Sequence, residues 1–237
     1  MKLLIIRHGD PDYSTDSLTE KGWKEADLLS KRLAKEKIDA FFCSPLGRAK
    51  DTAKATLEKH GAKAEILPWL EEFRGRIVSQ HTGNRRIPWD LSPCDWMGEP
   101  AYYDKEKWTQ TPLMQSGNVK EIFEETAAGV DALLKSFGIT KKGDVYTVCE
   151  KEEKTVALFC HMGLGLAVVA YLTGVSPMLL WHNFFLPTSS VTALVTETGE
   201  GGDAHFRCVQ MGDTSHLYAG GEPISRAGLY PYENFKM

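Results

Sequence analysis

KLLIIRHG, residues 2–9, joins an uninterrupted apolar run to an arginine, a histidine and a glycine. The run from Lys2 to Ile6 is typical of a strand buried on both faces, and open α/β sheets carry their sites at the carboxyl ends of such strands. A second stretch repeats the pattern, because the apolar run Thr155–Cys160 leads directly into His161. In a mostly parallel sheet these two strand ends lie side by side, so we predict that His8 and His161 converge on one point.

The residues that follow the first strand alternate between helical and extended patterns. Apolar side chains recur at three- and four-residue spacing over 19–37, which predicts an amphipathic helix with a capping box of Ser17 and Glu20. After a strand over 38–43, Ser44 and Pro45 fit the cap and first turn of a helix that runs to about residue 60. The other expected elements are strands at 64–67, 145–150, 155–160, 189–196 and 206–210, a charged turn at 151–154, and helices at 119–137 and 165–172.

This order of elements predicts one domain over residues 1–237, with an α/β fold and a mostly parallel sheet. The segment 74–117 interrupts the pattern, because it has no periodicity and contains Trp89, Trp96, Trp108 and four prolines. We interpret it as an insertion that covers the site, either as a fixed wall packed by its own aromatic residues or as a mobile lid.

Composition excludes several function classes. A formal net charge of -4 over 237 residues gives no basic footprint, so neither nucleic acid nor an anionic membrane is expected as a partner. The five cysteines are odd in number and have no CxxC spacing, which argues against a disulfide framework, a zinc site and an oxidising compartment.

The apolar run at the N-terminus has four residues, too few for a signal peptide or a membrane span, so we expect a soluble cytoplasmic protein. Nothing in the sequence indicates its oligomeric state.

Charged residues stand beside both predicted strand ends. Arg7 precedes His8, and Arg48 lies in the first turn of the helix after Ser44, where free backbone amides already favour an anion. Two guanidinium groups and two imidazoles suit a phosphate dianion. Glu71 and Glu72 follow the next short strand, and a carboxyl group at this edge could protonate a leaving alkoxide.

Six short motifs, spread over nearly the whole chain, resemble in sequence and in order those of the histidine phosphatase, or phosphoglycerate-mutase-like, superfamily. The motifs are Arg7-His8-Gly9, Leu18-Thr19-Glu20-Lys21-Gly22, Ser44-Pro45-Leu46-Gly47-Arg48-Ala49 with Thr52-Ala53, Leu70-Glu71-Glu72, His161-Met162-Gly163 and Gly212-Asp213-Thr214-Ser215-His216-Leu217.

The resemblance implies a three-layer α/β/α fold, a small phosphorylated substrate, neither a metal nor an organic cofactor, and a reaction through a phosphohistidine. By position, His8 would be the nucleophile and Glu72 the proton donor, with Glu71 as the alternative. The phosphoryl oxygens would be held by His161, Arg7, Arg48, Ser14, Thr19 and Met162.

The chain departs from the family pattern at places that bear on function. Ser14 stands where many members have asparagine, and Met162 stands where a small residue is common. The stretch Phe73-Arg74-Gly75-Arg76 lacks the longer signature that follows the acid in glycolytic mutases. A phosphomonoesterase is therefore the leading hypothesis. A mutase and a non-catalytic phospholigand-binding protein are the alternatives. The insertion would select the substrate, and its Arg74, Arg76, Arg85 and Arg86 either meet a second anionic group or face solvent.

Overall fold

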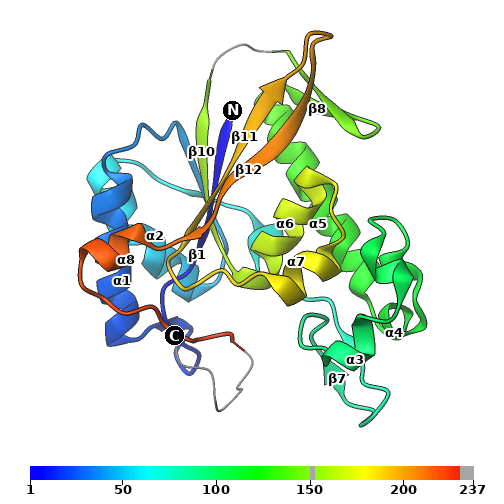
Figure 1. The fold of residues 1–237 in the computed structure, drawn as a ribbon. Coiled ribbons are helices and arrows are strands. Elements are labelled where there is room, and N and C mark those ends of the chain that lie inside the picture. The colour runs from blue at the N-terminus through cyan, green and yellow to red at the C-terminus, as the bar shows by residue number, and fades with distance from the viewer. Residues whose placement is uncertain (150–152, 230–237) are drawn as a thin grey trace.

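A computed structural model describes residues 1–149 and 153–229. An eight-stranded sheet in the order β5-β4-β10-β1-β11-β12-β9-β8 forms the middle layer (Figure 1). Its strands are β1 (Lys2–Arg7), β4 (Ala40–Cys43), β5 (Glu65–Ile66), β8 (Ile139–Lys142), β9 (Val145–Val148), β10 (Thr155–Cys160), β11 (Val191–Thr198) and β12 (Asp203–Asp213). None of the helices within the described ranges has the length and apolarity needed to cross a bilayer.

The sheet, which the sequence predicts to be mostly parallel, is mixed: it has a parallel half and an antiparallel half. β1 pairs in parallel with β10, and parallel pairing continues through β4 to β5. On its other side β1 pairs antiparallel with β11, and the order continues antiparallel through β12, β9 and β8. Both candidate histidines follow strands of the parallel half.

Helices cover both faces of the sheet, as the alternation of buried side chains in β1 requires. Leu4 and Ile6 pack on the face covered by α1 (Glu20–Leu33), α2 (Gly47–His60) and the short α8 (Ser215–Ala219). Leu3 and Ile5 pack on the opposite face with α5 (Val119–Ser136), α6 (Met162–Thr173) and α7 (Pro177–Asn183). Figure 1 shows the two helical layers on either side of the sheet. The predicted three-layer α/β/α fold is confirmed.

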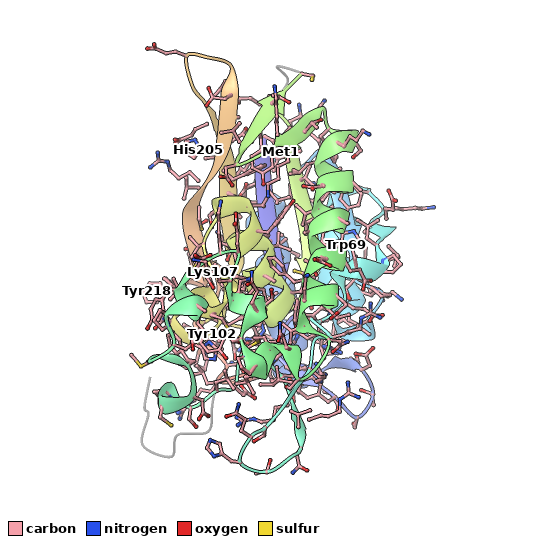
Figure 2. The ribbon with its side chains drawn as sticks, turned by 90° about the vertical axis from the view of Figure 1, so that its right-hand side faces the viewer. Met1, Trp69, Tyr102, Lys107, His205 and Tyr218 are labelled. Carbon is pink, nitrogen blue, oxygen red and sulfur yellow. The ribbon has the colours of Figure 1, made fainter. Side chains whose placement is uncertain are left out.

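The segment 74–117 forms small elements that are held together by aromatic side chains. They are the ribbon β6 (Ile77–Val78) with β7 (Arg85–Arg86), the one-turn helices α3 (Pro93–Trp96) and α4 (Pro112–Gln115), and the 3-10 turns Pro100–Tyr103 and Trp108–Gln110. Trp108 is 1% exposed and meets Trp181 of α7 edge to face, with ring centroids 5.5 Å apart. Figure 2 shows Tyr102 of this segment at the opposite end of the molecule from Met1, which lies at the start of β1. The insertion therefore stands at the carboxyl end of β1.

The structure differs from the sequence prediction at several elements. β8 and α7 were not expected, α6 begins three residues before the predicted start at 165, and β12 extends the strand predicted at 206–210 in both directions. β8 reads ITKK, so no apolar alternation marks it, and its place at the sheet edge explains why lysines are tolerated there. The last residue of the strand predicted at 145–150 and the first half of the turn predicted at 151–154 lie outside the described residues.

Both predicted caps are wrong. Helix α1 begins at Glu20, so its cap is Thr19, whose hydroxyl accepts a hydrogen bond from the backbone of Gly22 at 3.0 Å, while Ser17 donates to Asp51. Helix α2 begins at Gly47, past Ser44, and the carboxylate of Asp16 accepts from the backbone N–H of Gly47 at 2.7 Å. A residue from a distant loop thus caps α2, which local spacing could not reveal.

Thr19→Ala should lower the free energy of unfolding by about 1 to 2 kcal/mol, because it removes the hydroxyl that caps α1. Thr15→Ala is the matched control, since its hydroxyl donates to Asp12 on an exposed loop, and it should change stability by less than about 0.5 kcal/mol. Urea denaturation of both variants measures the difference. Equal losses would contradict a cap at Thr19.

Candidate active site

Two buried histidines lie side by side at the carboxyl ends of β1 and β10. The parallel register places Arg7 opposite Cys160, so the next residue of each strand is a histidine. His8 is 2% exposed, His161 is fully buried, and their ring centroids are 5.1 Å apart. The predicted convergence of the two imidazoles is confirmed, and their chemical roles remain predictions.

The His8 ring is held as a neutral tautomer with one free nitrogen lone pair. Its Nδ1 lies 2.7 Å from the carbonyl oxygen of Gly9, which can only accept, so Nδ1 carries the proton. Burial and the charges of Arg7 and Arg48 lower the pKa of His8 to about 3. The unprotonated Nε2 is therefore available as a nucleophile at neutral pH.

His161 is also kept neutral, because burial, the nearby His8 ring and the two arginines lower its pKa well below the ordinary value. Its Nε2 lies 2.8 Å from the hydroxyl of Ser44. Ser44, which we had expected to cap a helix, thus orients the second histidine. The Nδ1 atom of His161 is buried and has no hydrogen-bond partner within the described part of the chain.

Arg7 is buried with its guanidinium group at the wall of the site. It donates to the carbonyl oxygens of Leu186 at 2.6 Å and Ala227 at 2.8 Å, and to the sulfur of Met162 at 3.8 Å. These contacts come from three different parts of the chain and fix the plane of the guanidinium group. Its Nε is buried without a partner among the described residues.

Arg48 lies in the first turn of α2, as predicted, and its side chain is 11% exposed. Its guanidinium group pairs with the carboxylate of Asp16 and lies 5.5 Å from the centre of the Tyr13 ring. The same Asp16 carboxylate caps α2, so one residue positions both the helix and its arginine.

Glu72, rather than Glu71, reaches the site. Oε1 of Glu72 accepts hydrogen bonds from the backbone N–H groups of Phe73 and Leu164, each at 2.9 Å, so the carboxyl group lies against the first turn of α6. Both bonds use Oε1, which leaves Oε2 as the oxygen that could face a substrate. Glu71 instead lies 3.7 Å from Arg74, which also pairs with Glu125.

His8, Arg7, Arg48 and Glu72 line one cavity of about 400 Å³, which we call the histidine cavity, and His161 is buried beside His8. It is lined by Arg7, His8, Tyr13, Arg48, Glu72, Ile87, Trp89, Asp90, Met162, Gly228 and Leu229. Three of these residues, Ile87, Trp89 and Asp90, belong to the segment 74–117, so the insertion forms part of the wall. Of the six residues proposed for phosphate binding, Arg7, Arg48 and Met162 line this cavity, whereas His161, Ser14 and Thr19 do not.

Ser14 and Thr19 make other contacts. The hydroxyl of Ser14 is exposed and donates to Asp12 at 2.6 Å, and neither Ser14 nor Thr19 lines the histidine cavity. Thr19 donates to the carboxylate of Asp10 at 2.7 Å and caps α1. The structure therefore assigns Thr19 to the helix terminus, and it places Ser14 in an exposed turn where its short side chain meets a neighbouring carboxylate.

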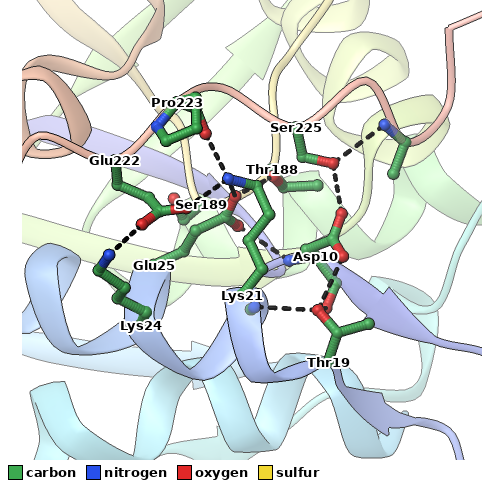
Figure 3. Close-up of polar contacts among 12 residues, drawn as sticks. Asp10, Thr19, Lys21, Lys24, Glu25, Thr188, Ser189, Glu222, Pro223 and Ser225 are labelled. Atoms are coloured by element: carbon green, nitrogen blue, oxygen red, sulfur yellow. Dashed lines mark hydrogen bonds and ion pairs between the residues drawn. The ribbon is translucent and has the colours of Figure 1, made fainter.

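The segment 221–229 forms a wall that sequence reasoning missed. Figure 3 shows how it is fastened, with Glu222 paired to Lys21 at 2.6 Å and to Lys24 at 2.5 Å, and with Ser225 donating to Asp10. Beyond these ties the carbonyl of Ala227 reaches Arg7. No motif marked this segment, because its contacts join residues about 200 positions apart in the sequence.

A second support lies behind His8. The backbone N–H of Ser189 donates to the carbonyl of His8 at 3.0 Å, and Ser189 has a φ of 56°, which is unusual for a residue with a side chain. The Ser189 hydroxyl lies 2.9 Å from Nε2 of His216. The late motif that contains His216 thus helps to hold the backbone at His8.

Comparisons with known proteins give a consistent picture. The model of the histidine phosphatase superfamily (branch 1) matches residues 3–209. The adenosylcobalamin/alpha-ribazole phosphatase of Salmonella typhimurium is 35% identical over 82 residues, which make up 31% of this chain and only 41% of that protein. The protein of the same name from Escherichia coli is 24% identical over 192 residues, or 77% of this chain and 84% of the relative. The native structure of mycobacterial glucosyl-3-phosphoglycerate phosphatase superimposes with a TM-score of 0.61 at 20% identity, covering 90% of this chain and 99% of that one.

The buried neutral histidines make stability depend on pH. The folded pKa of His8, about 3, lies below the ordinary value of 6.5, so its contribution is complete above about pH 6.5 and is lost as the pH falls towards 3. His216, with a pKa of about 4, acts in the same direction. The free energy of unfolding should therefore fall between pH 6.5 and 4, by up to about 1.4 kcal/mol per pH unit for each such histidine.

The dependence of the free energy of unfolding on pH is measured by urea denaturation at a series of pH values. His8→Asn should make this slope shallower, because it removes the contribution of one buried neutral histidine. The control is His205→Asn on β12, because the side chain of His205 is 57% exposed, and it should leave the slope unchanged. A His8→Asn slope equal to that of the unsubstituted protein would show that His8 is not held neutral by the fold.

Proposed function

The chain belongs to the histidine phosphatase superfamily, branch 1, and on that premise we propose that it is a metal-independent phosphomonoesterase that acts through a phosphohistidine on His8. The observation that carries the proposal is the His8 ring, which combines a free Nε2 with a position beside the His161 ring and in one cavity with Arg7 and Arg48. A nucleophile that must remain neutral is here surrounded by the cations that a phosphate dianion requires.

In the first step Nε2 of His8 attacks the phosphorus atom of the ester. The bond between phosphorus and the alcohol oxygen breaks, its electron pair stays on that oxygen, and Glu72 in its protonated form supplies the proton. The tautomer allows this attack because the hydrogen bond from Nδ1 to Gly9 supports the positive charge that develops on the ring.

In the second step a water molecule attacks the phosphorus atom of the phosphohistidine. Glu72, now a carboxylate, accepts the proton of the water, and the electron pair of the P–N bond returns to Nε2 of His8. The products are inorganic phosphate and the free imidazole, so the cycle closes without another reactant.

The cationic groups stabilise the charge on the transferring phosphoryl group. The buried Nε atoms of Arg7 and Arg48 and Nδ1 of His161 lack partners within the described ranges. The guanidinium N–H groups of the two arginines would donate to the phosphoryl oxygens, and Nδ1 of His161 would do so in the tautomer in which it carries the proton. Because the carbonyls of Leu186 and Ala227 and the carboxylate of Asp16 fix the two arginines beforehand, little reorganisation is required during the reaction.

The names of the three proteins compared above support hydrolysis of a small phosphorylated substrate over transfer to a second position. Both of the curated relatives described above are named as phosphatases, and so is the solved structure with the same fold. We also infer a cytoplasmic location from the five scattered cysteines, which cell fractionation would test.

Incubation with a ³²P-labelled substrate, followed by an alkaline quench, should give a labelled protein that loses its label in acid. His8→Ala should abolish the label and lower kcat more than about a thousandfold, since it removes the nucleophile. His205→Ala should behave like the unsubstituted protein.

All reactions contain EDTA, and release of inorganic phosphate is measured beside isomerisation of 3-phosphoglycerate. Faster isomerisation than release would establish a mutase instead, and full activity of His8→Ala would exclude this nucleophile.

Glu72→Gln should slow hydrolysis of ethyl phosphate by about 10² to 10⁴-fold, because the alkoxide leaves only with a proton. For 4-nitrophenyl phosphate, the rate of the first step should fall by less than about tenfold, since nitrophenolate leaves without a proton. Glu71→Gln is the matched control and should leave both rates unchanged. Burst kinetics separate the two steps, and a larger effect of Glu71→Gln would reassign the acid.

A further inference from the structure

A second cavity, of about 450 Å³, opens directly beside the histidine cavity. The two share Trp89, Asp90, Met162, Gly228 and Leu229 in their walls. The second cavity therefore adjoins the space beside His8. We call the second space the apolar cavity.

Aromatic and thioether side chains form most of its wall. Trp89 and Trp181 lie with ring centroids 5.9 Å apart, and Trp96 and Met162 are buried in the same wall. Two large apolar side chains are unusually exposed at the mouth, Met97 at 56% and Phe184 at 48%. Apolar surface of this kind, rimmed by polar residues, marks a place where an apolar ligand is covered.

One ring nitrogen in this cavity is an unused hydrogen-bond acceptor. The His182 ring stacks on Trp96 at a centroid distance of 4.8 Å, and its Nδ1 lies 2.9 Å from the carbonyl of Met178. Because that carbonyl only accepts, Nδ1 carries the proton and Nε2 is bare. Nε2 is buried and has no partner in the described part of the chain, which is costly unless a ligand donates to it.

The charges of the cavity do not suit an anionic leaving group. Its one arginine, Arg226, is exposed to solvent, and the carboxylate of Asp90 lines the same space. A carboxylate on the substrate would face tryptophan rings and Asp90, and it would lose its hydration there. None of the four insertion arginines lines this cavity. Arg74 pairs with Glu125, and Arg85 is exposed on β7. Arg76 and Arg86 donate to backbone carbonyls of the insertion, those of Gly75 and Asp90.

We propose that the apolar cavity is the leaving-group subsite and that it binds an aromatic alcohol with a hydrogen-bond donor that faces Nε2 of His182. The assignment rests on the proposed phosphatase function, because that function places the phosphoryl group at His8. The substrate class is then an arylalkyl phosphomonoester and not a small phosphorylated acid.

Esters whose alcohols have similar acidity separate ring binding from leaving-group chemistry. We compare kcat/KM for ethyl phosphate, 2-phenylethyl phosphate, 2-(indol-3-yl)ethyl phosphate, its N-methylated analogue and phosphoserine. The phenyl ring should raise kcat/KM about tenfold to a hundredfold over ethyl phosphate, since burying a ring contributes binding of that order. The indole N–H should raise it about tenfold further over the N-methyl ester.

Variants at exposed positions avoid a loss of folding. Phe184→Ala and Met97→Ala should lower kcat/KM for the three ring esters about three- to tenfold and leave ethyl phosphate unchanged, whereas the exposed Tyr218→Ala on α8 should change none of these values. His182→Phe keeps a ring on Trp96 and should erase only the preference for the indole N–H.

The outcomes distinguish this inference from the proposed function. Turnover of ethyl phosphate or phosphoserine at least as efficient as that of the ring esters would overturn the subsite while leaving the phosphatase intact. An equal loss for all esters in Phe184→Ala would overturn it as well. No hydrolysis of any ester, 4-nitrophenyl phosphate included, would overturn the phosphatase itself and with it the subsite.

Discussion

The backbone N–H of His8 donates to the carbonyl of Cys160 at 3.0 Å, and this bond at the end of the β1–β10 ladder holds the two candidate histidines at one height. Parallel pairing matters because it brings the carboxyl ends of two strands to the same edge of the sheet. An antiparallel neighbour, such as β11, presents the start of a strand at that edge. The other site groups are arranged around this pair, with Arg48 delivered by the helix after β4 and Glu72 by the turn after β5.

Burial and positive charge act together on the histidines. Both effects lower their pKa values, so the rings are neutral where water-exposed imidazoles would be partly charged. The same arginines then provide the positive potential that attracts a phosphate. The sheet beneath the site is closely packed, because Leu3, Leu4, Ile5 and Ile6 of β1 are all at most 1% exposed.

The two segments without regular periodicity complete the site. The insertion supplies Trp89, and the segment 221–229 supplies Leu229 and the carbonyl that holds Arg7. Gly163 shows how tightly these parts fit, because a Cβ at that position would lie 2.7 Å from the Trp89 ring and 3.0 Å from Glu72. A side chain at this position of α6 would therefore collide with both the cavity wall and the proposed acid. The buried Trp108 and Trp96 favour a fixed wall over a mobile lid for much of the insertion.

The sequence by itself determined the buried strands, the amphipathic helices and the arrival of a histidine at the end of β1 and of β10, since periodicity and apolar runs are local properties of the chain. It also identified Arg7, Arg48 and Glu72, all of which line the histidine cavity. Only the tertiary structure decided the cap of α2 by Asp16, the hydrogen bond of Ser44 to His161 and the different surroundings of Ser14 and Thr19. These depend on contacts between residues far apart in the chain, where spacing along the sequence carries no information. For the same reason the wall of segment 221–229 and the apolar cavity became visible only once the chain had folded.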